Sequence, residues 1–285
     1  MDIHRTKAEM RAARSDLVAD GATLGLVPTM GFLHDGHMAL VARARADCDR
    51  VAVSIFVNPT QFGPGEDFDS YPRDTDRDLE VLRKAGVDAV FLPEAGEMYP
   101  EGAETVVEPA RLSRILIGRL RPGHFAGVAT IVTKLFNIVQ PHAAYFGQKD
   151  YQQLCVIRRM VRDLDIPVRV EGVPIVRERD GLAMSSRNVR LTEEHRRAAP
   201  VLHAALEEGR RAIESGQGVT AAGEAIRARL AEAEAAEIGS VDLRDAGTLQ
   251  PLRGVAARPV VMLLAVRFGD VLLIDNMIAT PKEAA

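Results

Sequence analysis

Short apolar runs alternate with amphipathic, helix-like segments through the first two thirds of the chain. The run VAVSIFV (51–57) is apolar and β-branched at nearly every position, which is typical of a strand covered on both faces of a parallel sheet. In GHMALVARARADC (36–48), by contrast, Leu40, Val41, Ala44 and Cys48 recur at helical spacing. The elements predicted in this region are strand 24–28, helix 36–48, strand 51–57, helix 73–86, strand 87–92, strand 104–108, helix 125–139, strand 143–147 and helix 151–164. This alternation predicts an α/β fold with a Rossmann-like doubly wound parallel sheet.

The pattern changes after about residue 176. Residues 192–235 are rich in Ala, Glu and Arg and predict helices with a break at SGQG (215–218). Strands are predicted at 240–246, 259–269 and 270–278, the last two joined as a hairpin through FGD. We therefore expect residues 1–176 to form the Rossmann-like domain and residues 177–285 a smaller C-terminal α+β domain.

Composition narrows the class of protein. The 285 residues are 47% hydrophobic and 27% charged, with a net charge of −4, so nucleic acid would gain no general electrostatic attraction. The two cysteines, Cys48 and Cys155, lack CxxC spacing and are predicted to be reduced interior thiols. No apolar run is long enough to span a membrane, and the charged N-terminal segment does not resemble a signal peptide. These features predict a cytoplasmic protein.

Polar, glycine-rich segments follow four of the predicted strands. They are PTMGFLHDGH, NPTQFGPGEDF (58–68), GQKDYQQ (147–153) and RERDGLAMSSRN (177–188), the last after the strand-like VPIV. Each alone is also typical of an ordinary surface loop. Because the carboxyl ends of parallel strands share one edge of a sheet, we expect the four segments to gather along that edge, where such sheets bind ligands.

Two histidines, His34 and His37, lie three residues apart in HDGH. A zinc site would need three or four ligands, but the other five histidines show no partner spacing and HExxH is absent. Phosphate contacts suit the pair better, because Gly36 opens a predicted helix whose N-terminal N–H groups favour an anion. The imidazoles could then donate to phosphoryl oxygens as their charge grows.

Further phosphate ligands come from GQKD and MSSRN. These segments supply the cations Lys149 and Arg187 and the hydroxyls of Ser185 and Ser186, and Asp150 could anchor Mg²⁺ carried on a nucleotide. A lysine alone is more often a surface residue. No Walker A loop and no GxGxxG motif is present, so neither a P-loop NTPase nor a dinucleotide dehydrogenase is supported.

HDGH with MSSRN resembles the HxGH and KMSKS-like motif pair of the adenylate-forming nucleotidyltransferase superfamily. With PTMGFLHDGH, NPTQFG, YPR, RPGHF, YFGQKDYQQ and MSSRN in this order, the chain resembles the pantoate–β-alanine ligase family from about residue 20 to LIDN at 273–276. Asp35 stands where a glutamate is common in the family, and Asp74 where a threonine is common; neither change removes a needed function.

The resemblance implies a ligation in two steps, in which pantoate and Mg-ATP give pantoyl adenylate and pyrophosphate, and β-alanine then displaces AMP. It implies catalytic roles for His37, His34, Lys149 and Arg187, with His37 as donor to the departing pyrophosphate. The residues implied to bind ATP are Met30, Gly31, Phe32, Leu33, His34, Asp35, Gly36, His37, Gly147, Gln148, Lys149, Asp150, Val176, Met184, Ser185, Ser186 and Arg187.

For the other substrates the resemblance implies that Gln61 and Gln153 hold pantoate, with Gln61 also near β-alanine, and that Asn58 assists. His124 and Arg121 in RPGHF are weaker candidates, since that motif is also typical of a structural turn. Tyr71 and Asp78 match family positions but are assigned no direct role. The resemblance also implies a homodimer assembled through the N-terminal domain, and a second domain that closes over the ATP site.

Two other functions stay open at this point. Another small-molecule nucleotidyltransferase of the same superfamily would release pyrophosphate and stop at a nucleotidyl product, although NPTQF and GQKDYQQ argue for a site that holds a hydroxy acid and then admits an amine. A non-catalytic nucleotide-binding or metal-binding module is disfavoured by the intact histidines, lysine and SSR segment. An RNA-binding role lacks a basic, aromatic surface.

Overall fold

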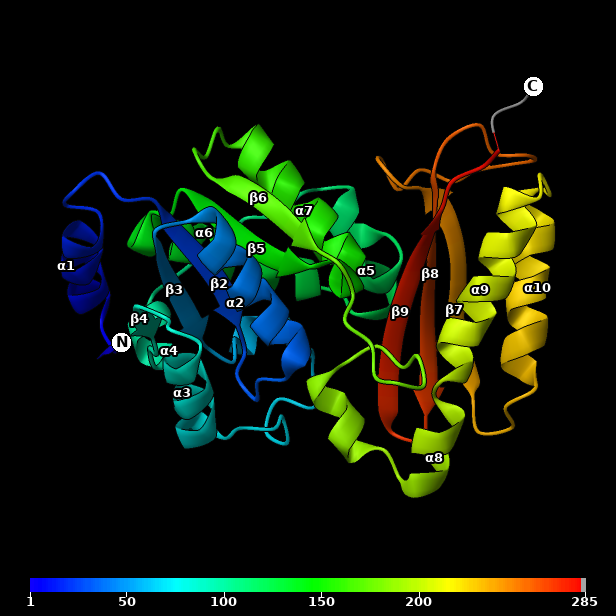
Figure 1. Cartoon of the computed structure of the whole chain (residues 1–285), viewed down its shortest axis with the longest axis horizontal. Coiled ribbons are helices and arrows are strands. Elements are labelled where there is room, and N and C mark those ends of the chain that lie inside the picture. The colour runs from blue at the N-terminus through cyan, green and yellow to red at the C-terminus, as the bar shows by residue number, and fades with distance from the viewer. Residues whose placement is uncertain (283–285) are drawn as a thin grey trace. The chain divides into compact units, whose positions relative to one another are not determined.

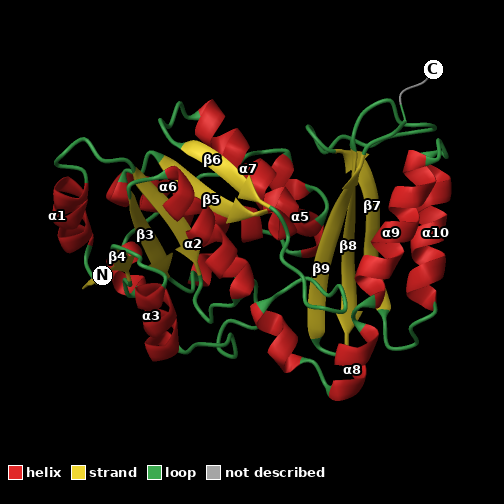
Figure 2. Ribbon diagram, in the orientation of Figure 1, coloured by secondary structure: helices red, strands yellow, loops and turns green. Residues whose placement is uncertain are grey.

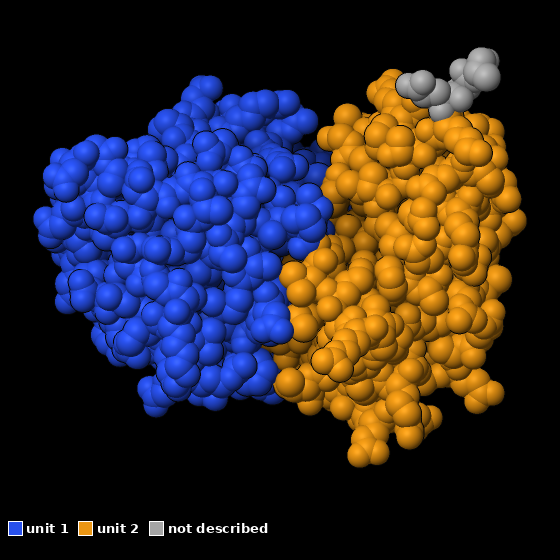
Figure 3. All heavy atoms as spheres, in the orientation of Figure 1, with its two compact units in different colours: residues 1–148, 152–174 blue, residues 149–151, 175–285 orange. Residues whose placement is uncertain are grey.

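The computed structural model describes residues 1–282 and divides the chain into two compact units (Figure 3). The first comprises residues 1–148 and 152–174, and the second comprises residues 149–151 and 175–285. The sequence predicts a boundary after residue 176, whereas the second unit begins at Ile175 and also includes Lys149–Tyr151. Each unit is described separately below.

A six-stranded parallel sheet forms the centre of the first unit, in the order β1-β4-β3-β2-β5-β6 (Figure 1). Its strands are β1 (Asp2–His4), β2 (Leu24–Thr29), β3 (Arg50–Ile55), β4 (Ala89–Phe91), β5 (Ala143–Gly147) and β6 (Arg169–Val173). The chain moves outward from β2 through β3 to β4 and then returns to β5 on the other side of β2. This reversal is the switch point at which doubly wound sheets open a crevice, and it confirms the predicted fold class.

Helices cover both faces of this sheet (Figure 2). They are α1 (Lys7–Leu17), α2 (Asp35–Asp47), α3 (Thr75–Lys84), α4 (Ala95–Met98), α5 (Ile117–Leu120), α6 (His124–Val139) and α7 (Tyr151–Asp163), with the 3₁₀ turns η1 (Pro59–Gln61), η2 (Leu112–Arg114) and η3 (Gln148–Asp150). Because parallel crossovers are right-handed, the switch point puts α2 and α3 on one face and α1, α6 and α7 on the other. On the first face, Leu40, Val41 and Ala44 of α2 pack on Val27 and Val53 of the sheet.

Three strand predictions in this unit were wrong or incomplete. The edge strand β1 was missed, because it has only three residues, largely polar and exposed, and is defined by its pairing with β4. Residues 104–108 form no strand; instead the N–H of Val107 donates to Thr130 Oγ1 of α6 at 2.9 Å. The strand near VPIV is β6, which ends at Val173 because Pro174 has no N–H with which to extend the ladder.

The second unit is an antiparallel sheet with helices, as predicted. It contains the 3₁₀ turn η4 (Ser186–Arg190), the helices α8 (Glu193–Ala198), α9 (Val201–Glu214) and α10 (Val219–Ala231), and the strands β7 (Glu237–Asp245), β8 (Val260–Phe268) and β9 (Val271–Ala279) in the order β7-β8-β9. Leu206 of α9 and Ile226 of α10 share one core with Met262 and Leu264 of β8. The predicted hairpin joins β8 to β9. Besides the predicted break at 215–218, Pro200 separates α8 from α9.

The structure also bears on two predictions from the sequence, the absence of a membrane-spanning segment and the reduced state of the two cysteines. Within residues 1–282, no helix is long and apolar enough to cross a membrane. Cys48 and Cys155 are free thiols, but both are half-buried rather than interior.

Candidate active site

The HDGH segment forms the beginning of α2, directly after the loop that leaves β2. His34 is the N-cap of the helix, and its Nδ1 accepts from the N–H of Gly36 at 3.1 Å. The Nδ1 of His37 in turn accepts from the N–H of His34 at 3.3 Å, which completes a capping box made of two histidines. The two ring centroids are 4.1 Å apart. Since an accepting Nδ1 carries no proton, each neutral ring carries its proton on Nε2, as a hydrogen-bond donor.

The loop between β2 and α2 is fixed by Asp78 of α3. This carboxylate is fully buried and accepts from the N–H of Phe32 at 2.6 Å and of Leu33 at 2.8 Å. Burial raises the pKa of Asp78, and the two N–H bonds oppose that effect. Gly31 has φ +81°, and a Cβ there would lie 3.2 Å from Asp78 Oδ2, so glycine suits both the conformation and the space. The backbone that leads to the histidines is therefore held from a neighbouring helix.

Asn58 and Gln61 lie side by side in the segment that follows β3. The Nδ2 of Asn58 donates to Gln61 Oε1 at 3.2 Å and to the carbonyl of Gly127 in α6 at 3.1 Å. The Nε2 of Gln61 faces the sulfur of Met30 at 2.8 Å, which links this segment to the loop that leaves β2. Because sulfur is a weak acceptor, a substrate oxygen could replace it as the partner of the Gln61 amide.

The orientation of the Asn58 amide is set by its hydroxyl neighbours. Asn58 Oδ1 accepts from Tyr99 Oη and from Thr60 Oγ1, both at 2.9 Å, so its NH₂ group must face Gln61. Burial raises the pKa of Tyr99, which keeps its hydroxyl protonated as a donor. Asn58 and Gln61 are both buried, and the order of their donors and acceptors is fixed before any ligand arrives.

Arg121 and His124 of RPGHF contact the backbone of Gln61. His124 Nδ1 lies 2.8 Å from the Gln61 carbonyl, and Arg121 Nη2 donates to the same oxygen at 3.4 Å. Arg121 also pairs with Glu66 through Nε and Nη2, and these bonds to the guanidinium lower the pKa of the Glu66 carboxyl. These contacts support the structural alternative for RPGHF, since both side chains brace the segment that carries Gln61.

The remaining candidates of the first unit lie beyond β5. Gly147 ends β5, and Gln148 Nε2 donates to the carbonyl of Gly172 in β6 at 3.5 Å. Gln153 is half-buried on the first turn of α7. Its neighbour Gln152 is buried and binds the turn before α5, accepting from the N–H of Ile117 and donating to two carbonyls of that turn.

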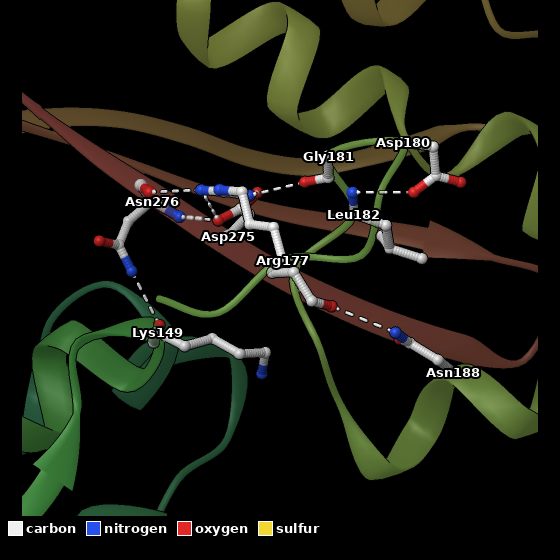
Figure 4. A network of polar contacts seen from close by, with 9 residues as sticks. Lys149, Arg177, Asp180, Gly181, Leu182, Asn188, Asp275 and Asn276 are labelled. Atoms are coloured by element: carbon white, nitrogen blue, oxygen red, sulfur yellow. Dashed lines mark hydrogen bonds and ion pairs between the residues drawn. The ribbon is translucent and has the colours of Figure 1, made fainter. Parts of the chain in front are cut away.

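The other predicted nucleotide ligands belong to the second unit. Lys149 and Asp150 lie on η3, and the carbonyl of Lys149 accepts from Asn276 Nδ2 of β9 at 2.8 Å (Figure 4). Within residues 1–282 no group of three or more His, Cys, Asp or Glu side chains is placed to hold a metal ion.

A tight hairpin precedes the MSSRN segment. Arg177 bridges to Ala183 across it, and the N–H of Met184 donates to the carbonyl of Val176 at 3.0 Å. Ser185 then caps η4, with its Oγ accepting from the N–H of Arg187 at 3.3 Å. The hairpin pairing and the cap of η4 therefore connect five predicted ATP ligands through backbone hydrogen bonds: Val176, Met184, Ser185, Ser186 and Arg187.

Several residues of these networks were not predicted. The sequence gives Asp78 no role and does not single out Glu66, Tyr99, Gln152, Asn276 or Asp275, whose carboxylate accepts from Arg177. The local sequence around these residues does not indicate their roles, because each one contacts a segment that lies far away in the chain. The one usable hint was LIDN, which places an acid and an amide in an otherwise apolar strand.

Known proteins similar to this chain agree with one another. Residues 2–278 match the family model described as pantoate-beta-alanine ligase. A pantothenate synthetase of Sinorhizobium medicae is 55% identical over 98% of this chain and 96% of its own length, and one of Bartonella tribocorum is 52% identical over 99% of both chains.

Solved structures give the same result. The pantothenate synthetase of Thermus thermophilus has a TM-score of 0.91 at 49% identity, covering 97% of this chain and 99% of that one. The pantoate-beta-alanine ligase of Francisella tularensis, complexed with beta-gamma ATP and beta-alanine, has a TM-score of 0.81 at 33% identity, covering 98% of this chain and 97% of that one.

Proposed function

The chain belongs to the pantoate–β-alanine ligase family, and from this membership we propose how its own residues carry out the ATP-dependent condensation of pantoate with β-alanine. In the first half-reaction a carboxylate oxygen of pantoate attacks the α-phosphorus of ATP, and the bond to pyrophosphate breaks. In the second, the amine of β-alanine attacks the acyl carbon of pantoyl adenylate; the bond to AMP breaks and a proton is released. Neither step needs a covalent enzyme nucleophile, so positioning and charge neutralisation supply the catalysis.

The histidine pair carries this proposal. Both Nδ1 atoms accept backbone N–H groups at the start of α2, so both neutral rings carry their proton on Nε2, the atom from which they can donate. Donors fixed in advance stabilise charge that develops on the oxygens of departing pyrophosphate without reorganising. His37 is the principal donor and His34 stands beside it, with the remaining phosphate charge met by Lys149, Ser185, Ser186 and Arg187.

Amide side chains bind pantoate in this proposal. Gln61 offers its Nε2–H₂ because Asn58 occupies its Oε1, and Gln153 provides a second amide for pantoate. Neutral amides bind a hydroxy acid without the tight ion pair that would weaken its carboxylate as a nucleophile.

Exchange of labelled pyrophosphate into ATP, with β-alanine omitted, tests the first half-reaction. Exchange that requires pantoate supports the proposal, whereas exchange without pantoate favours another nucleotidyltransferase. His37→Asn keeps an acceptor near Nδ1 but removes the Nε2 donor, and should slow exchange by about 10²–10³-fold. His37→Gln, whose amide nitrogen reaches toward the Nε2 position, should retain more activity.

A matched control is available in His142. Its Nδ1 also accepts a backbone N–H, that of Leu24 at 2.9 Å, but it lies where β2 begins rather than where it ends. His142→Asn likewise keeps an acceptor near Nδ1 and removes Nε2, and should leave the exchange rate within about twofold. Equal exchange rates for the wild type and His37→Asn would remove His37 from this role.

The metal, the assembly and the location belong to the proposal as well. Mg²⁺ enters with ATP, and Asp150 is its candidate protein ligand. We expect a homodimer assembled through residues 1–176, in the cytoplasm, with a mass twice the 31.0 kDa of the chain in light scattering. Substitution Asp150→Asn should raise the Mg²⁺ concentration needed for half-maximal exchange, and an unchanged requirement would exclude Asp150 as a ligand.

A further inference from the structure

Two adjacent polar residues, Asp275 and Asn276, interrupt the apolar strand β9. Both are almost completely buried, with exposed fractions of 2% and 4%. Successive side chains of a strand point to opposite faces, so this pair can hold two different segments at once. Buried polar groups are normally fully hydrogen-bonded, and their partners show what they hold (Figure 4).

Asp275 holds the hairpin that precedes Ser185. Its carboxylate accepts two bonds from Arg177, with Nη1 to Oδ2 at 2.6 Å and Nη2 to Oδ1 at 3.0 Å. Arg177 Nη1 also donates to the carbonyl of Gly181 at 3.0 Å, across the turn of the hairpin. A forked pair of this kind fixes orientation as well as distance.

The far side of the hairpin is tied to the MSSRN segment. Asn188 Nδ2 donates to Glu178 Oε1 at 3.0 Å and to the carbonyl of Ala183 at 3.1 Å. Arg196 pairs with Glu178 and with Asp180 at 2.5 and 2.6 Å. The backbone of residues 184–187 is thus connected to β9 through a short, hydrogen-bonded path.

Asn276 holds the backbone of Lys149. Its Nδ2 donates to the Lys149 carbonyl at 2.8 Å, and two residues further Tyr151 Oη donates to the carbonyl of Ala246 at 2.8 Å. These bonds explain why Lys149–Tyr151 belong to the second unit although Gln148 and Gln152 belong to the first.

We propose that Asp275 and Asn276 are positioning residues that hold Lys149 and the Ser185–Arg187 segment as one phosphate-binding assembly. This inference rests on the proposed role of those residues in binding ATP. A lysine side chain is long and flexible, so the reach of its ammonium depends on where its backbone is fixed. Displacement by about 1 Å can cost a reaction about 100-fold.

The test uses Asn276→Leu, which keeps the side-chain shape and removes the donor. Three quantities are measured in the full-length protein: affinity for Mg-ATP by calorimetry, pantoate-dependent pyrophosphate exchange, and the rate at which supplied pantoyl adenylate reacts with β-alanine. We expect ATP affinity to fall at least fivefold and exchange at least tenfold. The second half-reaction, which involves no pyrophosphate, should stay within twofold.

Two further variants separate positioning from general destabilisation. Leu230→Ala opens a cavity in the core of the same unit, on α10, and should lower the melting temperature without a selective loss of exchange. Arg177→Lys keeps the charge but not the fork, and should show the selective loss in milder form if Asn276→Leu fails to fold.

The outcomes are distinct. ATP affinity within twofold of the wild type in Asn276→Leu and Arg177→Lys would overturn the inference, as would an equal fall of both half-reactions that Leu230→Ala reproduces. Absence of exchange in the wild type would instead refute the proposed function. In that case the ATP affinities of the same variants would still decide whether Asp275 and Asn276 position the phosphate-binding residues.

Discussion

Gly127 lies in the buried first half of α6, where that helix crosses the segment that carries Gln61. A Cβ at this position would lie 2.4 Å from the Thr60 carbonyl oxygen and 2.7 Å from the Gln61 nitrogen. Ordinary contact begins at 3.4 Å, so Gly127→Ala requires a shift of about 1 Å, the difference between 3.4 and 2.4 Å. The obstructing atoms are backbone, so a side-chain rotation cannot relieve the clash.

Two opposing effects set the change in stability. Alanine favours a helix over glycine by about 1 kcal/mol, while an additional methyl group in a packed core costs about 1–3 kcal/mol. The free energy of unfolding should therefore fall by about 0–2 kcal/mol. The effect on activity should be larger, because a 1 Å displacement of Gln61 misplaces its amide, and kcat/KM for pantoate should fall about 10–100-fold.

Steady-state kinetics with varied pantoate measures this effect, and urea unfolding measures stability. Most of the loss should come from a higher KM for pantoate, while the KM for ATP changes little. Gly223→Ala is the matched control, since Gly223 is also helical but its Cβ would meet only Leu243 Cδ1 at 3.5 Å. That variant should be as stable as the wild type or slightly more stable, with unchanged kinetics.

The reasoning would be refuted by a Gly127→Ala enzyme with kcat/KM for pantoate within twofold of the wild type. It would also be refuted if the KM values for pantoate and ATP rose together, because the contact lies at Thr60 and Gln61 and not at the histidine segment.

Three other predictions follow from buried or paired groups. Asp78→Asn replaces one of the two carboxylate oxygens that accept the N–H groups of Phe32 and Leu33 with an NH₂ group, so one buried N–H loses its acceptor and the free energy of unfolding in urea should fall by about 1.5–3 kcal/mol; no change would contradict the anchoring role. Arg121 lowers the pKa of Glu66, so their pairing stabilises the fold above the ordinary value of 4.5 and is lost as pH falls through the lowered pKa. Glu66→Gln should thus lower stability at pH 7 but not in strong acid, and an equal loss at both pH values would argue against the pair. Burial raises the pKa of Cys155 from 9.0 to about 11, so its alkylation by iodoacetamide at pH 8 should be about 100-fold slower in the folded than in the urea-unfolded protein, by mass spectrometry; equal rates would contradict this.

The sequence alone predicted the candidate phosphate-binding segments because each is continuous. HDGH, GQKD and MSSRN are short motifs whose residue types suit phosphate, and together with NPTQFG, YPR and RPGHF their order along the chain resembles one family. The parallel sheet was equally accessible, because its inner strands are apolar over their whole length. Short edge elements were not, since β1 is held only by its partner β4 and residues 104–108 direct Val107 to a side chain of α6.

The tertiary structure decided how these segments are held. The histidine tautomers follow from backbone N–H groups at the start of α2, and the Gln61 amide is oriented by Asn58, which is oriented in turn by Tyr99. Lys149 is attached to the second unit by Asn276, a residue 127 positions away in the chain. Periodicity and motifs report on neighbours in sequence, whereas a buried hydrogen bond requires two groups that only the folded chain brings together. That is why the sequence identified the candidate ligands and the structure identified the residues that position them.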